Sequence, residues 1–228
     1  MFPWSKIFCL STLLLSMTQS AWAGVVVGGT RVIYDSAKRE ASISVSNPEK
    51  INPFLIQSWV ENEQESDTRK TPFIITPPLF RLDPGQENVL RIVHTGSPLP
   101  SDKESLYWLN IKSIPSTTKT DQNQLQISVK TQIKLIYRPS ALNSKAAEAY
   151  KQLTFTRQGN QLQVTNPTPY YIAFFSVKVG DMEVKDAGTV EPMSSLSWAL
   201  PAGAGSSVSW SAINDYGGIT SIARQVSF

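Results

Sequence analysis

The feature that most constrains this chain is a strict alternation of apolar and polar side chains over residues 124–138, QLQISVKTQIKLIYR. A period of two predicts a β-strand, which at about 3.3 Å per residue would be on the order of 50 Å long. Strands usually run about 3–10 residues, so we expect part of this one to extend beyond its own sheet. Most proteins avoid an open apolar strand edge, and a chain that keeps one offers it to a partner. The apolar face comprises Leu125, Ile127, Val129, Ile133, Leu135 and Tyr137.

The N-terminus has the order of a secretory signal peptide. Lys6 precedes an apolar run over residues 7–17, and Ala21-Trp22-Ala23 supplies the small residues for cleavage after Ala23. The run is shorter than the roughly 20 residues that span a bilayer. An uncleaved signal anchor is the alternative. No later segment is long and apolar enough for a membrane span, so we expect an exported chain without membrane insertion.

Composition excludes several classes of protein. The only cysteine, Cys9, lies inside the signal, so the mature chain depends on its core and not on disulfides. Without Lys6, 20 basic residues stand against 18 acidic ones, and this small excess does not indicate nucleic-acid binding. The acidic stretch that includes Glu61 and Glu63 is typical of a solvated loop.

Runs rich in β-branched and aromatic residues recur at about 8–12-residue intervals between Gly, Pro, Asn and Asp clusters. This pattern predicts an all-β fold of two immunoglobulin-like β-sandwich domains. The first seven strands are expected at 30–34, 40–46, 54–61, 73–76, 87–94, 107–114 and 124–138. The second seven are expected at 153–157, 161–165, 171–179, 190–192, 195–200, 206–214 and 219–228. Pro139 ends the first series, and residues 144–149 are the one convincing helical turn. The expected division is a signal peptide at 1–23, an N-terminal domain at 24–140 and a C-terminal domain at 141–228.

No pattern of residues supports catalysis. The one histidine, His94, has no Ser–Asp or Cys partner pattern, and His and Cys are too few for a metal site. No glycine-rich loop leads into a helix, so no nucleotide site is expected. We therefore expect no enzyme activity, no cofactor and no metal. Trp198 and Trp210 admit a sugar-binding site, but core packing is the simpler use of both.

Two basic residues are candidates for a binding site. Arg31 lies near the mature N-terminus, and Lys134 lies on the polar face of the long strand. Each alone fits an exposed strand charge. If the fold brings both into one cleft, they would bind a carboxylate, Arg31 through its planar fork and Lys134 as a point charge. Composition alone does not place them together.

Several segments, in the same order, resemble the periplasmic pilus-assembly chaperones of the chaperone–usher pathway. They lie in both predicted domains, at residues 30–34, 76–81, 99–115, 133–139, 166–171 and 213–218. The resemblance implies two domains set at an angle with a cleft between them. It also implies a periplasmic chaperone that binds, folds and caps pilus subunits and delivers them to an outer-membrane usher without ATP. A structural pilus component and a secreted carbohydrate-binding β-sandwich protein are the alternatives.

The resemblance assigns roles to residues already singled out. Arg31 and Lys134 match a pair that anchors the C-terminal carboxylate of a pilus subunit. Leu125, Ile127 and Val129 match side chains that fill the open groove of an incomplete subunit, to which the strand is lent. We expect self-association or loop cover to protect this strand in the free protein.

A further implied site joins the domains. Arg91, Glu104 and Asp215 match an interdomain ion-pair network, with separate exposed charges as the alternative. Only residues 116–124 separate Pro115 from Leu125, so the chain resembles the group of these chaperones with a short loop before the long strand.

Overall fold

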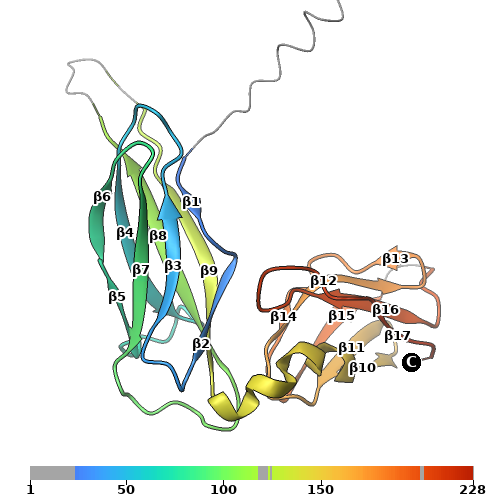
Figure 1. Cartoon of the computed structure of the whole chain (residues 1–228). Helices are drawn as coiled ribbons and strands as arrows, with labels where there is room; N and C mark the ends of the chain where they lie inside the picture. The colour runs from blue at the N-terminus through green and yellow to red at the C-terminus, as the bar shows by residue number, and fades with distance from the viewer. Residues whose placement is uncertain (1–23, 118–122, 124, 201–202, 228) are drawn as a thin grey trace, which may run out of the picture.

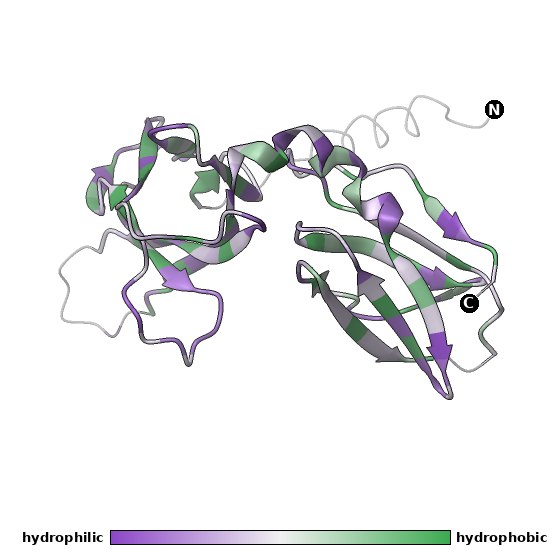
Figure 2. Ribbon diagram, turned by 90° about the horizontal axis from the view of Figure 1, so that it is seen from below, coloured by the Kyte–Doolittle hydropathy of each residue, from purple (hydrophilic) through white to green (hydrophobic). Residues whose placement is uncertain are grey.

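The computed structural model describes residues 24–117, 123, 125–200 and 203–227; the predicted signal peptide lies outside them. Two β-sandwiches are set at an angle and joined at one end by a 3₁₀ helix, η1 (Ser140–Gln152) (Figure 1). Figure 2, turned by 90°, shows η1 bridging the two domains. The predicted all-β, two-domain fold is confirmed. The predicted boundary at residue 140 stays a prediction, and η1 extends beyond the expected turn at 144–149.

The N-terminal sandwich consists of two sheets. The first has the strand order β1-β3-β7-β5, made of β1 (Val26–Val27), β3 (Ala41–Ser46), β7 (Glu87–His94) and β5 (Phe73–Thr76). The second has the order β2-β9-β8-β4-β6, made of β2 (Arg31–Asp35), β9 (Val129–Arg138), β8 (Ser105–Pro115), β4 (Phe54–Asn62) and β6 (Leu79–Leu82). β2 pairs with β9 in parallel, and the other neighbours are antiparallel. Alternate side chains, such as fully buried Leu90 and Ile92 on β7, build the core between the sheets.

The chain crosses from the first sheet to the second between β1 and β2. Gly28 donates its N–H to the carbonyl of Ser44 at 2.9 Å, and a Cβ on Gly28 would lie 2.3 Å from Ser44 Oγ. A larger residue at this position would have to displace the Ser44 hydroxyl, so glycine favours this close approach. The crossing places β2 beside β9 with Arg31 opposite Lys134 in register.

The long strand is shorter than its sequence pattern predicts. β9 begins at Val129, and residues 125–128 belong to no strand. The last pair with β8 is Ser113 with Val129. Continued further, the same register would pair Ile114 with Ser128 and then Ile127 with Pro115, which has no N–H to donate. The prediction of one strand over 124–138 was therefore wrong at its N-terminal end.

The C-terminal sandwich also has two sheets. One is β10 (Thr154–Gln158), β11 (Gln161–Asn166) and β15 (Ser194–Ala199). The other has β13 (Met182–Glu183), β12 (Ile172–Val179), β16 (Val208–Ala212) and β17 (Ala223–Gln225) in that order, and β14 (Thr189–Val190) pairs with β12. Trp210 is 3% exposed and Trp198 packs edge-on against Phe174, so both serve the core.

His94 lies in an aromatic cluster with Tyr34, Phe73 and Tyr137. This packing fits a structural role. Among the described residues, no helix has the length and apolar character that a membrane crossing requires.

Candidate functional site

A cleft lies where the two sandwiches meet. A cavity of about 170 Å³ there is lined by Arg31 and Arg138 from the N-terminal domain and by Tyr170, Tyr171 and Asp215 from the C-terminal domain. The sheet that faces it contains β2 and β9. The cleft therefore brings together segments that are distant in the sequence.

Arg31, which lines this cavity, has Lys134 as its neighbour on the same face of the sheet. They are backbone partners across β2 and β9, and because Val32 and Leu135 next to them enter the core, both cations lie on the opposite face. Arg31 donates from Nη1 to the carbonyl of Ile213 at 3.0 Å, whereas its Nε is buried without a hydrogen-bond partner. Within the described residues, neither cation forms an ion pair with a carboxylate. Among the described residues, the site is thus a pair of like charges with no carboxylate in ion-pair contact.

The electrostatics of the pair favour an incoming anion. Burial lowers the pKa of Lys134, the positive charge of Arg31 lowers it further, and Glu63 opposes both. Burial also lowers the pKa of Arg31, against the opposing charges of Asp215 and Glu104. A carboxylate between the two cations would stabilise both charged forms.

An open strand edge adjoins this cation pair. β2 pairs only with residues 134–138 of β9, so residues 129–133 have β8 on one side and no described strand on the other. Val129 is 56% exposed, and the preceding Ile127 and Leu125 are 67% and 89% exposed. The edge and its apolar side chains are accessible to a partner strand.

A buried ion-pair network links the domains a short distance further along β9. Arg138 donates from Nε to Glu104 Oε1 at 2.6 Å and from its two terminal nitrogens to the carboxylate of Asp215 at 2.6 and 2.8 Å. The other oxygen of Glu104 accepts the backbone N–H of Tyr171 at 2.7 Å. Glu104 is 2% exposed and Arg138 6% exposed. This network fixes the C-terminal domain against the end of β9.

The prediction that Arg91 belongs to the network was wrong. Arg91 lies on β7 in the other sheet, beside Ser42 and Thr76, and is exposed because Leu90 and Ile92 take the core positions. The cation that pairs with Glu104 and Asp215 is Arg138. The sequence carried a signal for it, because Arg138 lies on the polar face of the long strand, four residues after Lys134, where Pro139 ends the sheet.

Burial and ion pairing have opposite effects on the pKa values of Glu104 and Arg138. Burial raises the pKa of Glu104, and the charge and hydrogen bonds of Arg138 oppose that rise. Burial alone would lower the pKa of Arg138, but hydrogen bonds to Asp215 and the charge of Glu104 outweigh it and raise that pKa. Arg138 is therefore a permanent cation with two carboxylate partners.

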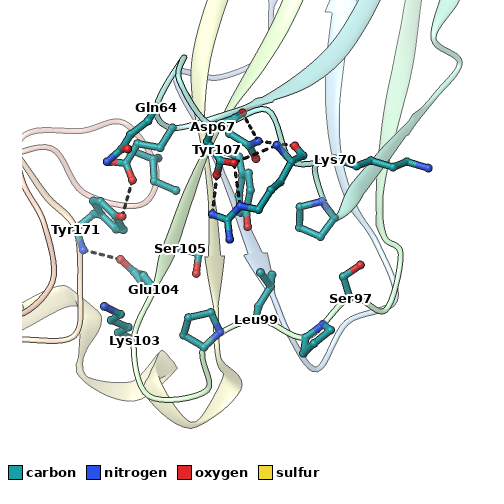
Figure 3. Close-up of a pocket in the computed structure, with 17 residues that line it drawn as sticks. Gln64, Asp67, Lys70, Ser97, Leu99, Lys103, Glu104, Ser105, Tyr107 and Tyr171 are labelled. Carbon is teal, nitrogen blue, oxygen red and sulfur yellow. Dashed lines mark hydrogen bonds and ion pairs between the residues drawn. The ribbon is translucent and has the colours of Figure 1, made fainter.

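A second cavity, of about 470 Å³, lies between the end of β4, the start of β8 and Tyr171 of the C-terminal domain (Figure 3). Figure 3 shows the Tyr171 N–H directed at Glu104, and the Tyr171 hydroxyl donates to Glu63 at 2.9 Å. Burial raises the pKa of Glu63. Glu63 is thus half-buried and bonded across the domains, unlike the solvated loop predicted for it. In the described part of the chain, no group of three or more His, Cys, Asp and Glu side chains is placed to hold a metal ion.

Known families match both sandwiches. Residues 24–143 match the family model described as "Pili and flagellar-assembly chaperone, PapD N-terminal domain", and residues 148–223 match "Pili assembly chaperone PapD, C-terminal domain". A probable fimbrial chaperone LpfB of Escherichia coli O157:H7 is 48% identical over 215 residues, covering 92% of each chain. The chaperone protein FimC of Escherichia coli K12 is 40% identical over 221 residues, covering 93% of this chain and 90% of FimC.

Solved structures agree with these relatives. A Salmonella enterica complex of SafA pilin with the SafB chaperone matches with a TM-score of 0.82 and 35% identity, over 91% of this chain and 98% of the other. The Escherichia coli chaperone DraB matches with a TM-score of 0.79 and 40% identity, over 89% and 95%. The chain belongs to the PapD-like family of fimbrial and pilus-assembly chaperones.

Proposed function

We propose that this protein is a non-catalytic periplasmic chaperone that holds the C-terminal carboxylate of a pilus subunit between Arg31 and Lys134. The subunit adds a strand to the open edge of β9 and is then delivered to an outer-membrane usher. The observation that carries this proposal is the juxtaposition of two cations lacking a carboxylate partner, within the described residues, and a strand edge without a neighbour.

The apolar side chains beside the edge supply affinity. Burying Leu125, Ile127 and Val129 in an incomplete sandwich would contribute roughly 1.5–3 kcal/mol each before the cost of ordering them. Backbone hydrogen bonds along β9 would add to this, and the alternation of side chains would set the register. The carboxylate anchor would fix where the added strand ends.

The relatives support the class of partner and the compartment. The SafB chaperone is seen in complex with a pilin, and the related SfaE is described as a periplasmic chaperone. The signal-peptide pattern of residues 1–23 is consistent with export to the periplasm. A short loop before β9, as in the group the sequence resembles, stays a prediction because part of the segment lies outside the described residues.

The test is co-purification from the periplasm. The wild-type chaperone, expressed with the pilus genes of its own organism, should carry bound subunits that mass spectrometry identifies. Lys134→Ala should stay folded and lose them. Lys130→Ala is the matched control, since Lys130 lies on the same strand but pairs with Glu61 at 3.5 Å. A normal yield of complex from Lys134→Ala would overturn the anchor.

A further inference from the structure

The ammonium group of Lys134 rests on an aromatic ring. Its Nζ lies 5.2 Å from the centroid of the Trp108 indole. The two residues are opposite each other in the β8–β9 register, so they occupy the same face of the sheet. Cation–π attraction is strongest where water is excluded, and both side chains here are partly buried.

The indole is fixed by the loop after β4. Trp108 donates from Nε1 to the backbone carbonyl of Glu63 at 3.2 Å. The Glu63 carboxylate accepts the hydroxyl of Tyr171 at 2.9 Å, and the Tyr171 N–H donates to Glu104 at 2.7 Å. A continuous series of contacts therefore leads from the C-terminal domain to the ring below Lys134.

We propose that Trp108 is a positioning residue for the carboxylate anchor. Its indole holds the Lys134 ammonium beside Arg31, and the Glu63–Tyr171 hydrogen bond holds the loop that fixes the indole. A lysine has four rotatable side-chain bonds, and Arg31 repels it. Without the ring, Lys134 would turn toward solvent, and the two cations would no longer converge on one carboxylate. This inference rests on the proposed function.

The same sheet face offers a matched control. Lys130 lies 5.4 Å from the centroid of Trp59, and Trp59 donates from Nε1 to the Glu61 side chain at 2.8 Å. This second lysine–tryptophan pair has the same chemistry. Lys130 already has Glu61 as its carboxylate partner and is not adjacent to Arg31. Removing Trp59 should leave the anchor unchanged.

The probes are two synthetic 12-residue peptides of one sequence with alternating apolar residues, one ending in a free carboxylate and the other in an amide. The measured quantity is the ratio of their dissociation constants, by calorimetry. Wild type should prefer the free carboxylate, and Trp108→Leu should reduce the preference by about fivefold. Trp108→Phe, which retains an aromatic face, should keep most of it, and Trp59→Leu should keep all of it.

Tyr171→Phe tests the supporting loop. It removes only the hydroxyl and keeps the backbone bond to Glu104, so it should reduce the preference by less than Trp108→Leu does. The double variant with Trp108→Leu and Tyr171→Phe should lose no more of the preference than Trp108→Leu alone, because both changes disturb the same placement of Lys134. If Trp108→Leu does not fold, Tyr171→Phe decides alone, and an unchanged preference in it contradicts the proposal.

The outcomes separate this inference from the proposed function. A wild-type protein that binds both peptides equally contradicts the carboxylate anchor itself. Two other outcomes would contradict only the role of the indole, provided that the wild type prefers the free carboxylate. In the first, Trp108→Leu keeps the wild-type preference. In the second, Trp108→Phe retains no more of the preference than Trp108→Leu does.

Discussion

Two groups of charges lie on one face of β9, and they differ in how they are paired. Arg138 is almost fully buried and binds two carboxylates, Glu104 and Asp215. Lys134, four residues earlier, is half-buried beside Arg31 and forms no ion pair among the described residues. Arg138 is therefore fully paired, whereas Lys134 has no carboxylate of the described residues in ion-pair contact.

This difference separates a structural role from a binding role. A buried ion pair adds little net stability but becomes costly when one partner is lost, so Arg138 fixes how the domains meet. Two adjacent cations without a carboxylate destabilise the free protein and are relieved by a bound anion. If a subunit carboxylate binds there as proposed, it would remove this repulsion, and the complex would regain the free energy that the free protein loses at Lys134.

The largest expected effect is on the paired group. Arg138→Met would leave the buried Glu104 without its cation, so the free energy of unfolding should fall by about 3–5 kcal/mol. Urea denaturation followed by circular dichroism measures it. Arg91→Ala, on the exposed face of β7, is the control and should change stability by less than about 0.5 kcal/mol. Equal losses of unfolding free energy in the two variants would contradict the assignment of the buried ion pairs to Arg138 in place of Arg91.

A smaller loss of stability is expected where the C-terminal domain contacts Thr30, the residue before β2. Gly217 has φ +83°, and a Cβ there would lie 2.5 Å from Thr30 Oγ1 of the N-terminal domain. Gly217→Ala should cost about 1–2 kcal/mol for the backbone conformation and about 1 kcal/mol more for the clash. Gly203→Ala has φ +78° with no heavy atom within 4 Å of the new Cβ, so it should show the backbone cost alone. Thermal or urea unfolding of both variants compares them, and equal costs would remove the domain contact from the explanation.

A gain in the free energy of unfolding, and not a loss, is expected when Lys134 is replaced. Lys134→Met removes one of two neighbouring cations, so the free protein should gain stability on the order of 0.5–1 kcal/mol while losing its preference for a carboxylate. Urea unfolding and peptide binding on one preparation measure both quantities. A destabilised Lys134→Met would mean that the attraction of Lys134 to the Trp108 ring and to Glu63 outweighs its repulsion from Arg31.

The smallest effect is a pH dependence. The folded-state pKa of Lys134 is lowered by burial and by Arg31, so the folded protein releases this proton at a lower pH than the unfolded chain does. The free energy of unfolding should therefore rise as the pH increases from the lowered pKa toward the ordinary value for lysine. The preference for a carboxylate should fall over the same alkaline window. Lys134→Arg stays charged in this window, so neither its free energy of unfolding nor its preference for a carboxylate should change with pH. If both quantities are equally constant in the wild type, the pKa of Lys134 is not lowered.

The sequence predicts the strands well because alternation directly reports a two-sided sheet. The expected 73–76 and 87–94 coincide with β5 and β7. The two-residue strands β1 and β13 were missed, since two residues show no periodicity, and the four-residue β6 was missed as well. The start of β9 was also missed, because alternation continues through residues 125–128 although their partner strand ends.

The cleft was harder to predict because it depends on how the strands align. The β2–β9 register places Arg31 beside Lys134, and neither residue alone reveals that neighbour. Family resemblance suggested the pair but placed Arg91 where the structure has Arg138. Trp108 and Glu63 had no assigned role, because their contacts join a strand, a loop and the second domain.

The most direct test of the account is amide hydrogen exchange along residues 125–133. The account predicts fast exchange in the dilute free protein for Leu125, Ile127 and those amides of 129–133 that face away from β8. Strong protection of the same amides is predicted in the complex with a co-purified subunit. Equal protection in the two states would contradict the claim that the edge of β9 is where the subunit binds.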